Sequence, residues 1–351
     1  MTSNEDRNFR YGYYGKVGCG GIEEKKSIEI LLREKPPDLL ARLAQLSSRY
    51  SLSAQQRKQI WQLLLDVVKI DARISEVRVE IQRQIVNDII DGLRLMGLIE
   101  ENLPDLDQIE RKIGEHSKIL VVIYLFETRQ LTSDLPKQLE KIEVQDLLTL
   151  SEVFIKEFVQ PIGPNVLEDA YQLFKNFVCI VNSNFGILIE MYEKFVHGLA
   201  NDDNVLHKHL VQKGIIKAND SHANSTMAST SILSIGSAQL SNSIVTKSNE
   251  RKNLFHKQKI GSFRPLITWF MRFFSGIIHQ NYIIRVLDKV VGCLINGSKP
   301  FYILISVSKA LILYLRNRLL LLNTTEQLKN YLLSPLTLEE SEKIVAKALN
   351  S

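Results

Sequence analysis

Few arrangements of residues in this chain have the spacing that catalysis or metal binding requires. The glycine-rich run at 18–21 lacks the Gly-Lys-Ser/Thr ending of a phosphate-binding loop, and no apolar strand precedes it. His207 and His209 would lie about 200° apart on a helix, so their imidazoles cannot converge on one metal ion. The Gly-x-Ser-x-Gly signature of a nucleophilic serine is absent from the sequence. We therefore expect no metal site and no bound cofactor.

The composition is that of a soluble globular protein. Of the 351 residues, 45% are hydrophobic and 24% are charged, which is enough apolar material for a core that needs no disulfide. The three cysteines are far apart and odd in number, which favours a reducing compartment. The net charge of +5 is modest, and both signs are mixed along most of the predicted helices, so we expect no nucleic-acid partner.

One stretch, residues 301–322, is apolar enough to suggest a membrane helix. It carries Lys309, Arg316 and Arg318, and each charge at mid-bilayer would cost about 2.5–3.5 kcal/mol. A helix buried in a helical stack explains the stretch better. Residues 1–10 are polar and no apolar segment of a signal peptide follows them. We expect a cytoplasmic protein without stable membrane insertion, with peripheral association with lysosomal or vesicle membranes as a further possibility.

Helical periodicity dominates the chain, and no run alternates with period two over the length of a strand. Ile28, Leu31 and Leu32 have the spacing of one helical face, and Ser53 is placed to cap a helix at 54–68. Pro335 separates two short helices at the end of the chain. The other expected helices are at 75–96, 105–113, 117–130, 142–159, 165–182, 184–200, 263–277, 281–296 and 300–322.

A change of composition divides the chain. Residues 217–253 are rich in Ser and Asn and bury too little apolar surface to offset the entropy of ordering, so they predict a disordered insertion. A phosphorylated regulatory loop is the functional alternative for this segment. The expected organisation is therefore an N-terminal segment at 1–21, a first helical part at 22–216, the insertion, and a second helical part at 254–351.

Two distant segments together resemble the TBC-domain family of Rab GTPase activators. The first is Arg-Lys-Gln-Ile-Trp-Gln-Leu-Leu-Leu at 57–65; the second comprises an aromatic cluster at 269–274, Ile-Arg-Val-Leu-Asp-Lys-Val-Val at 284–291, and Gly297. In the family, an early Arg-x-x-Val-Trp helix and a late Arg-Ile-Trp-Asp helix frame an all-helical, V-shaped domain. Leu287 replaces the usual Trp of the late motif. The resemblance implies an all-α, TBC-type multi-helix fold.

The N-terminal residues resemble one branch of this family more closely, the branch that forms the third subunit of the tuberous sclerosis complex beside hamartin and tuberin. The resemblance is clear over 7–68 and 263–333 and weak in the middle of the chain. The residues that carry it at the N-terminus are Arg7-Asn8-Phe9-Arg10, Tyr13-Tyr14, Lys16-Val17-Gly18 and Glu23-Glu24-Lys25-Lys26-Ser27.

Active members of the family supply an Arg from Ile-x-x-Asp-x-x-Arg and a Gln from Tyr-x-Gln-Gly to a bound Rab GTPase. An arginine finger contributes about 10³–10⁵ in rate. Asp91 and Arg94 keep the Asp-x-x-Arg spacing, but Asp88 stands in place of the leading Ile, and a surface ion pair explains the two equally well. Gln145 is the best-placed second finger, although the Tyr and Gly of its motif are missing. Two degenerate motifs argue against strong GTPase activation.

The segment 118–126 is apolar on nearly every face of a helix, which indicates either deep burial or a partner. The resemblance implies a helical face that receives the hamartin C-terminal coiled coil. The residues expected in or near that surface are Leu120, Val121, Ile123, Tyr124 and Glu127, with an internal core helix as the alternative. The first functional hypothesis is therefore a docking subunit that supports tuberin's GAP activity toward Rheb and restrains TOR signalling. The alternative is a Rab GTPase activator that uses Arg94, with or without Gln145.

Overall fold

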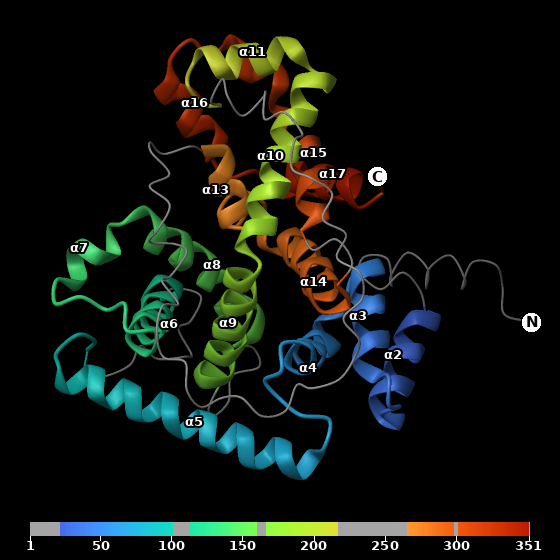
Figure 1. Cartoon of the computed structure of the whole chain (residues 1–351), viewed down its shortest axis with the longest axis vertical. Coiled ribbons are helices and arrows are strands. Elements are labelled where there is room, and N and C mark those ends of the chain that lie inside the picture. Colours follow the sequence, from blue (N-terminus) through green and yellow to red (C-terminus); the bar gives the residue numbers. More distant parts are fainter. Residues whose placement is uncertain (1–21, 101–111, 160–165, 217–264, 298–300, 351) are drawn as a thin grey trace, which may run out of the picture.

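The computed structural model describes residues 22–100, 112–159, 166–216, 265–297 and 301–350. Within these ranges every regular element is a helix and there is no strand, which confirms the all-α prediction (Figure 1). The predicted helix at 105–113 lies mostly outside the described residues, and the predicted insertion at 217–253 lies entirely outside them.

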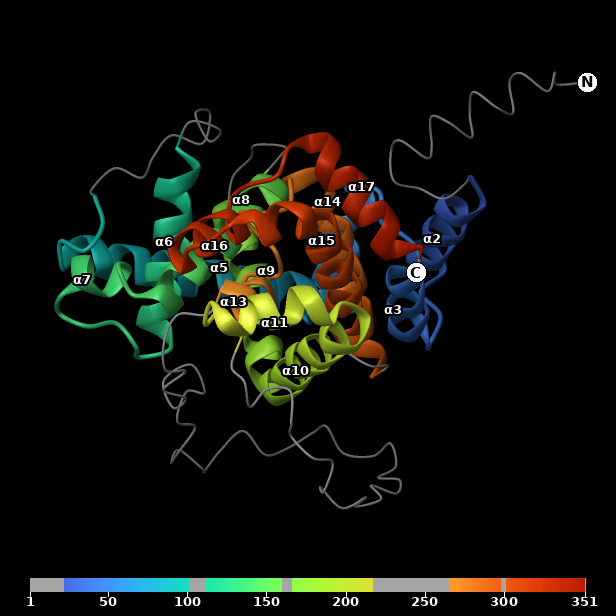
Figure 2. The same ribbon diagram turned by 90° about the horizontal axis from the view of Figure 1, so that it is seen from above.

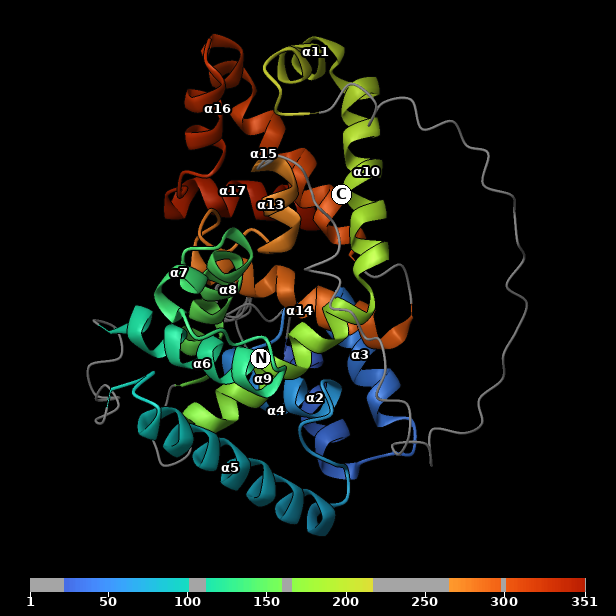
Figure 3. The same ribbon diagram turned by 60° about the vertical axis from the view of Figure 1, so that its left-hand side comes forward.

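The first part of the chain forms one end of the molecule. The long helix α5 lies across this end, at the periphery in both Figure 1 and Figure 3, and packs against α6 and α9. The helices of this part are α2 (Ile22–Glu34), α3 (Leu39–Arg49), α4 (Ala54–Leu64), α5 (Ala72–Leu95), α6 (Ile113–Glu127), α7 (Leu135–Leu139), α8 (Ile142–Phe158) and α9 (Val166–Ser183).

The helices from α10 onward build the opposite end, which therefore includes two helices, α10 and α11, from the range 22–216 of the predicted first helical part. Seen from above in Figure 2, α14, α15 and α17 lie side by side, and all three pairs are in contact. The helices are α10 (Phe185–Asp202), α11 (Asn204–Gln212), α13 (Pro265–Met271), α14 (Gln280–Asn296), α15 (Tyr302–Leu321), α16 (Thr325–Leu332) and α17 (Leu338–Leu349). Pro335 separates the last two helices, as predicted.

Helix α14 joins the two parts because it packs against α3, α4 and α8 on one side and against α15 and α17 on the other. Its contact with α3 is close at Gly292, where a Cβ atom would come within 2.6 Å of the Ala44 carbonyl oxygen and of the Ser48 amide nitrogen. Only glycine permits this approach of two helix backbones. The packing of α3 therefore depends on one residue that lacks a side chain.

An aromatic cluster fills the interior between α4, α8 and α9. Trp61 is fully buried and contacts Phe154, Phe158 and Phe177, with ring centroids 5.8, 5.1 and 6.4 Å away. Phe177 also contacts Phe273, which follows α13, so the cluster continues into the second part of the chain. Aromatic pairs at such distances add about 0.5–1.5 kcal/mol to the energy of burial.

Two predicted helices are shorter than expected, and in both cases a left-handed residue ends the helix. The helix predicted at 54–68 ends at Leu64 because Asp66 has φ of 57°. The helix predicted at 263–277 is reduced to α13 because Phe273 and Phe274 have φ of 51° and 62°. Non-glycine residues rarely adopt this conformation, so residue types gave no warning of these ends.

Helix α15, which covers the apolar stretch at 301–322, lies inside the helical stack. Its inner side chains are buried, among them Leu304, Val307 and Leu311. The charged residues lie at its outer side, where Lys309 pairs with Asp202 and Arg316 with Asp203. No helix in the described ranges is both long enough and apolar enough to cross a membrane.

Candidate functional site

The two segments that carry the family resemblance meet in the interior at Asp288. This carboxylate on α14 is fully buried and accepts hydrogen bonds from Arg57 Nε at 2.9 Å, Trp61 Nε1 at 2.9 Å and the Leu52 amide at 3.1 Å. Arg57 also pairs with Glu157 of α8. We call Asp288, Arg57, Trp61 and Glu157 the Asp288 junction, because it ties α14 to α4 and α8.

Burial and opposite charge act against each other at the junction, and burial raises the pKa of both Asp288 and Glu157. Burial alone would lower the pKa of Arg57, but the carboxylates of Asp288 and Glu157 outweigh burial and raise it. Burial raises the pKa of Asp288, and the Arg57 guanidinium, the Leu52 amide and the Trp61 indole act against that rise. Arg57 Nε, Nη1 and Nη2 and Trp61 Nε1 each donate to a group within the chain, so the groups of the junction depend on one another. The junction is structural.

The predicted arginine finger lies near the C-terminal end of α5. Arg94 Nη1 donates to Asp91 Oδ1 at 2.7 Å, and 30% of the Arg94 side chain is exposed. Arg94 Nε is buried and lacks a hydrogen-bond partner among the described residues. Gln145, near the start of α8, is exposed, but its side-chain amide donates to the Leu139 carbonyl at 2.6 Å. No hydrogen bond joins Arg94 to Gln145, and α6 packs against both of their helices.

The residues of α6 that were expected to meet a partner lie in the interior instead. Leu120, Val121 and Ile123 are fully buried, and Tyr124 is almost fully buried. Burial raises the pKa of Tyr124, whose hydroxyl accepts a hydrogen bond from Asn182 at 3.2 Å. These side chains fill the space between α5, α8 and α9, so they are not available to a partner in this structure.

Glu127, the fifth residue of that expected surface, lies at the end of α6 and is partly buried. Its carboxylate accepts a hydrogen bond from Tyr171 and pairs with Lys175, both on α9. The neighbouring Phe126 is 37% exposed. The all-round hydrophobicity of this helix therefore reflects burial on nearly every side.

The apolar surface that the fold leaves open lies on α5. Its members, which we call the outer stripe, are exposed by roughly half: Ile74 (58%), Val77 (63%), Ile81 (54%) and Ile85 (46%). The inner face of the same helix buries Val86, Ile90 and Leu93. At about 100° per residue, the two sets lie about 140° apart around the helix. Scattered exposed apolar residues are ordinary, but four in line on a peripheral helix form a surface that the core does not use.

The chain is similar to TBC-domain proteins both in structure and in sequence. A search of solved structures matches the chain to the Ypt/Rab-GAP domain of Gyp1p with a TM-score of 0.52, at 12% identity, covering 94% of this chain and 97% of that one. The chain has the TBC-domain fold. Two relatives are similar over the whole length: TBC1 domain family member 7 of Xenopus tropicalis at 25% identity and that of Homo sapiens at 24%, each covering 100% of this chain and 96% of the relative. No protein-family model matches.

The late motif differs from the usual TBC pattern at Leu287 and keeps the Asp that follows it. Leu287, which stands where the family usually has Trp, is fully buried, so an apolar core residue is kept at that place. The following Asp288 is kept and engages Arg57 and Trp61 of the early motif. The buried residues of these two motifs thus specify how two distant helices join.

The sequence interpretation missed the outer stripe of this TBC fold, although the signal was present. Ile74, Val77, Ile81 and Ile85 follow one another at spacings of three, four and four residues, the spacing of a helix-pairing face. The interpretation recognised one amphipathic helix at 75–96 and did not separate its two apolar faces. The core of the chain covers only the inner apolar face of α5, so the outer stripe remains exposed.

Proposed function

We propose that this chain is a non-catalytic or weakly catalytic TBC-domain subunit that binds the hamartin coiled coil. In that role it stabilises the tuberous sclerosis complex, supports its Rheb-directed GAP activity and so restrains TOR signalling. The observation that carries the proposal is the outer stripe of α5, an apolar helical face that faces solvent. We expect the subunit in the cytoplasm, with peripheral association with lysosomal or vesicle membranes.

The outer stripe has the chemistry of a helix-pairing surface. Ile74, Val77 and Ile81 take the a, d and a positions of a heptad, and β-branched residues at position a favour two-stranded pairing. A partner that covers them would remove apolar surface from water without uncovering any of the core. Since each of these side chains is already about half covered, the gain is on the order of 1 kcal/mol per residue.

The family resemblance is the basis for naming hamartin as the partner. The shape of α5 is the reason for placing the contact on this helix. Helix α5 is long, with 24 residues, and the outer stripe is exposed over three of its turns. Leu95 and Met96 at its C-terminal end are also exposed. A coiled coil is itself a long apolar seam, so it can follow such a helix in the helix-in-groove manner.

Rab GTPase activation through Arg94 is the second candidate. It is favoured by the buried, unpartnered Arg94 Nε and by the retained spacing to Asp91. Against it, the Arg94 guanidinium is held by Asp91 and the Gln145 amide by Leu139. Catalysis through both groups would require each to leave its present partner.

One paired experiment separates the two functions. The purified chain is tested for capture of the hamartin coiled coil, and in parallel for stimulated GTP hydrolysis on a panel of Rab GTPases, with wild type and Arg94→Ala. The docking proposal expects capture by both proteins and no hydrolysis that depends on Arg94. Hydrolysis that Arg94→Ala abolishes, together with no capture of hamartin by wild type, would overturn it.

A further inference from the structure

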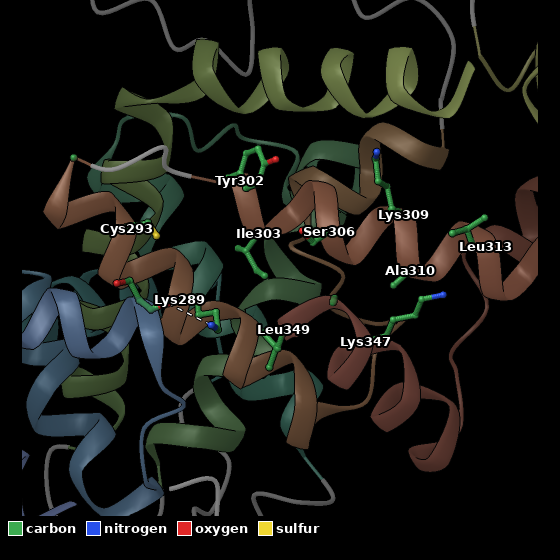
Figure 4. A pocket seen from close by; sticks show the side chains of 13 residues that line it. Lys289, Cys293, Tyr302, Ile303, Ser306, Lys309, Ala310, Leu313, Lys347 and Leu349 are labelled. Atoms are coloured by element: carbon green, nitrogen blue, oxygen red, sulfur yellow. Dashed lines mark hydrogen bonds between the residues drawn. The ribbon is translucent and has the colours of Figure 1, made fainter. Parts of the chain in front are cut away.

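A groove of about 950 Å³ opens between α14, α15 and α17, away from the outer stripe of α5 (Figure 4). Its apolar floor comes from Ile303, Ala310 and Leu313 of α15 and from Leu349 of α17. Leu313 is 42% exposed, although most apolar side chains of α15 are buried. The groove is thus a second place where this fold presents apolar surface to solvent.

The shape of the floor fits a helix. Ile303, Ser306, Ala310 and Leu313 follow at spacings of three, four and three residues, so they form one line along α15. The two small side chains in the middle lie between two large ones, which makes a saddle. Small residues at a crossing let a second helix approach toward the lower end of the usual 8–10 Å interaxial range.

The charged side chains that line the groove, among the described residues, are all lysines. Lys289, Lys309 and Lys347 contribute to its lining, and no Asp or Glu does. Lys309 and Lys347 lie on either side of Ala310 in Figure 4. Lys347 makes no ion pair or hydrogen bond within the described part of the chain. Lys309 pairs with Asp202 at 2.7 Å in an exposed contact, and such pairs exchange partners at little cost.

We propose that this groove binds an amphipathic helix of a partner protein whose apolar face is flanked by Asp or Glu. The apolar residues of that helix would lie over Ser306 and Ala310, and its carboxylates would pair with Lys347 on one side and Lys309 on the other. Lys289 serves as a fixed part of the wall, because its ammonium group donates to the Ser48 and Arg49 carbonyls. The site is separate from α5 and does not depend on the proposed docking of hamartin.

The test uses a display library of short amphipathic helices with Leu on one face and Glu or Lys randomised at the flanking positions. The library is selected on the wild-type chain and counter-selected on Lys347→Glu. The matched control is Lys343→Glu, one turn earlier on α17, because Lys343 pairs with Glu339 and does not line the groove. We expect enriched helices with Glu flanks whose affinity falls at least about tenfold on Lys347→Glu and stays unchanged on Lys343→Glu.

Two native cysteines locate the bound helix without further mutation. Cys293 lines the groove, whereas Cys179 is exposed on α9 outside it. An enriched helix should slow maleimide labelling of Cys293 and leave that of Cys179 unchanged. The proposal is overturned if no helix is enriched over the Lys347→Glu background, if the enriched helices carry Lys flanks, or if Cys293 stays unprotected. Binding to vesicles containing phosphatidylinositol phosphate that Lys347→Glu abolishes, without any helix enriched, would also overturn it.

Discussion

The Asp288 junction and the outer stripe of α5 differ in how their side chains are satisfied: those of the junction are buried and paired, whereas those of the stripe are apolar and exposed. At the junction, a buried carboxylate collects three donors from residues more than 200 positions away. On the outer stripe, four apolar side chains are about half exposed and lie in a line along α5. The first arrangement is satisfied within the chain, whereas the second leaves apolar surface exposed, which is why we propose it as a docking surface.

The difference indicates that family motifs lie among buried, interacting residues, whereas partner-binding surfaces lie among exposed residues. Charged and aromatic residues that must meet in the interior constrain one another, so they stay recognisable at low sequence identity. A docking face constrains only apolar character and spacing, so its individual residues carry no signature. In this protein the recognisable residues build the frame, and the surface proposed for function lies elsewhere.

Removal of the central carboxylate should have the largest effect. Asp288→Ala leaves Arg57 buried with Glu157 as its remaining charged partner and leaves the Trp61 indole without an acceptor. We expect the free energy of unfolding to fall by about 3–5 kcal/mol, the cost of breaking a buried ion pair. Urea denaturation followed by circular dichroism measures it. A loss below about 1 kcal/mol, the range of exposed pairs, would show that the junction does not hold the helices together.

Two glycine variants should change stability in opposite directions. Gly292→Ala places a methyl group 2.6 Å from the backbone of α3, so we expect a loss of about 1–3 kcal/mol from overpacking. Gly92→Ala in α5 meets no atom within 4 Å, so better helix propensity should add about 0.5–1 kcal/mol. Thermal denaturation of both variants checks the pair. Equal effects of the same sign would contradict the close contact between α14 and α3.

The exposed ion pair on α5 should matter least. Asp91→Ala removes the 2.7 Å contact to Arg94, and Asp91 is 67% exposed, so we expect a change within about 0.5 kcal/mol in the free energy of unfolding. The same denaturation experiment as for Asp288→Ala measures it. A much larger loss would mean that the position of Arg94 is under constraint, which would favour the GTPase-activator alternative.

Much of the helical framework could be predicted from the sequence, because the residues that indicate each helix lie close together along the chain. The apolar spacing of Ile28, Leu31 and Leu32 predicted α2, and Ser53 does precede α4. Its hydroxyl, however, bonds the Gln56 side chain and does not cap a backbone amide. The premature ends at Asp66 and after Met271 could not be predicted, since they depend on left-handed backbone conformations that tertiary contacts impose.

The candidate surface was harder to predict than the frame. Apolar residues around all of α6 are equally consistent with burial and with docking, and only the positions of α5, α8 and α9 decide for burial. Conversely, the outer stripe of α5 could not be recognised as exposed until the side that packs on α6 and α9 was known. Periodicity gives the faces of a helix, and tertiary structure determines which face remains free.

The most direct test of the account is calorimetric titration of the hamartin coiled coil into the wild-type chain, Ile81→Glu and Glu80→Ala. Ile81 is at the centre of the outer stripe, and Glu80 is an exposed neighbour on the same helix but outside the stripe. We predict that Ile81→Glu weakens binding at least about tenfold while Glu80→Ala changes it by less than about threefold, because only the first puts a charge into the apolar contact. Equal affinity of all three proteins for hamartin would contradict docking through α5.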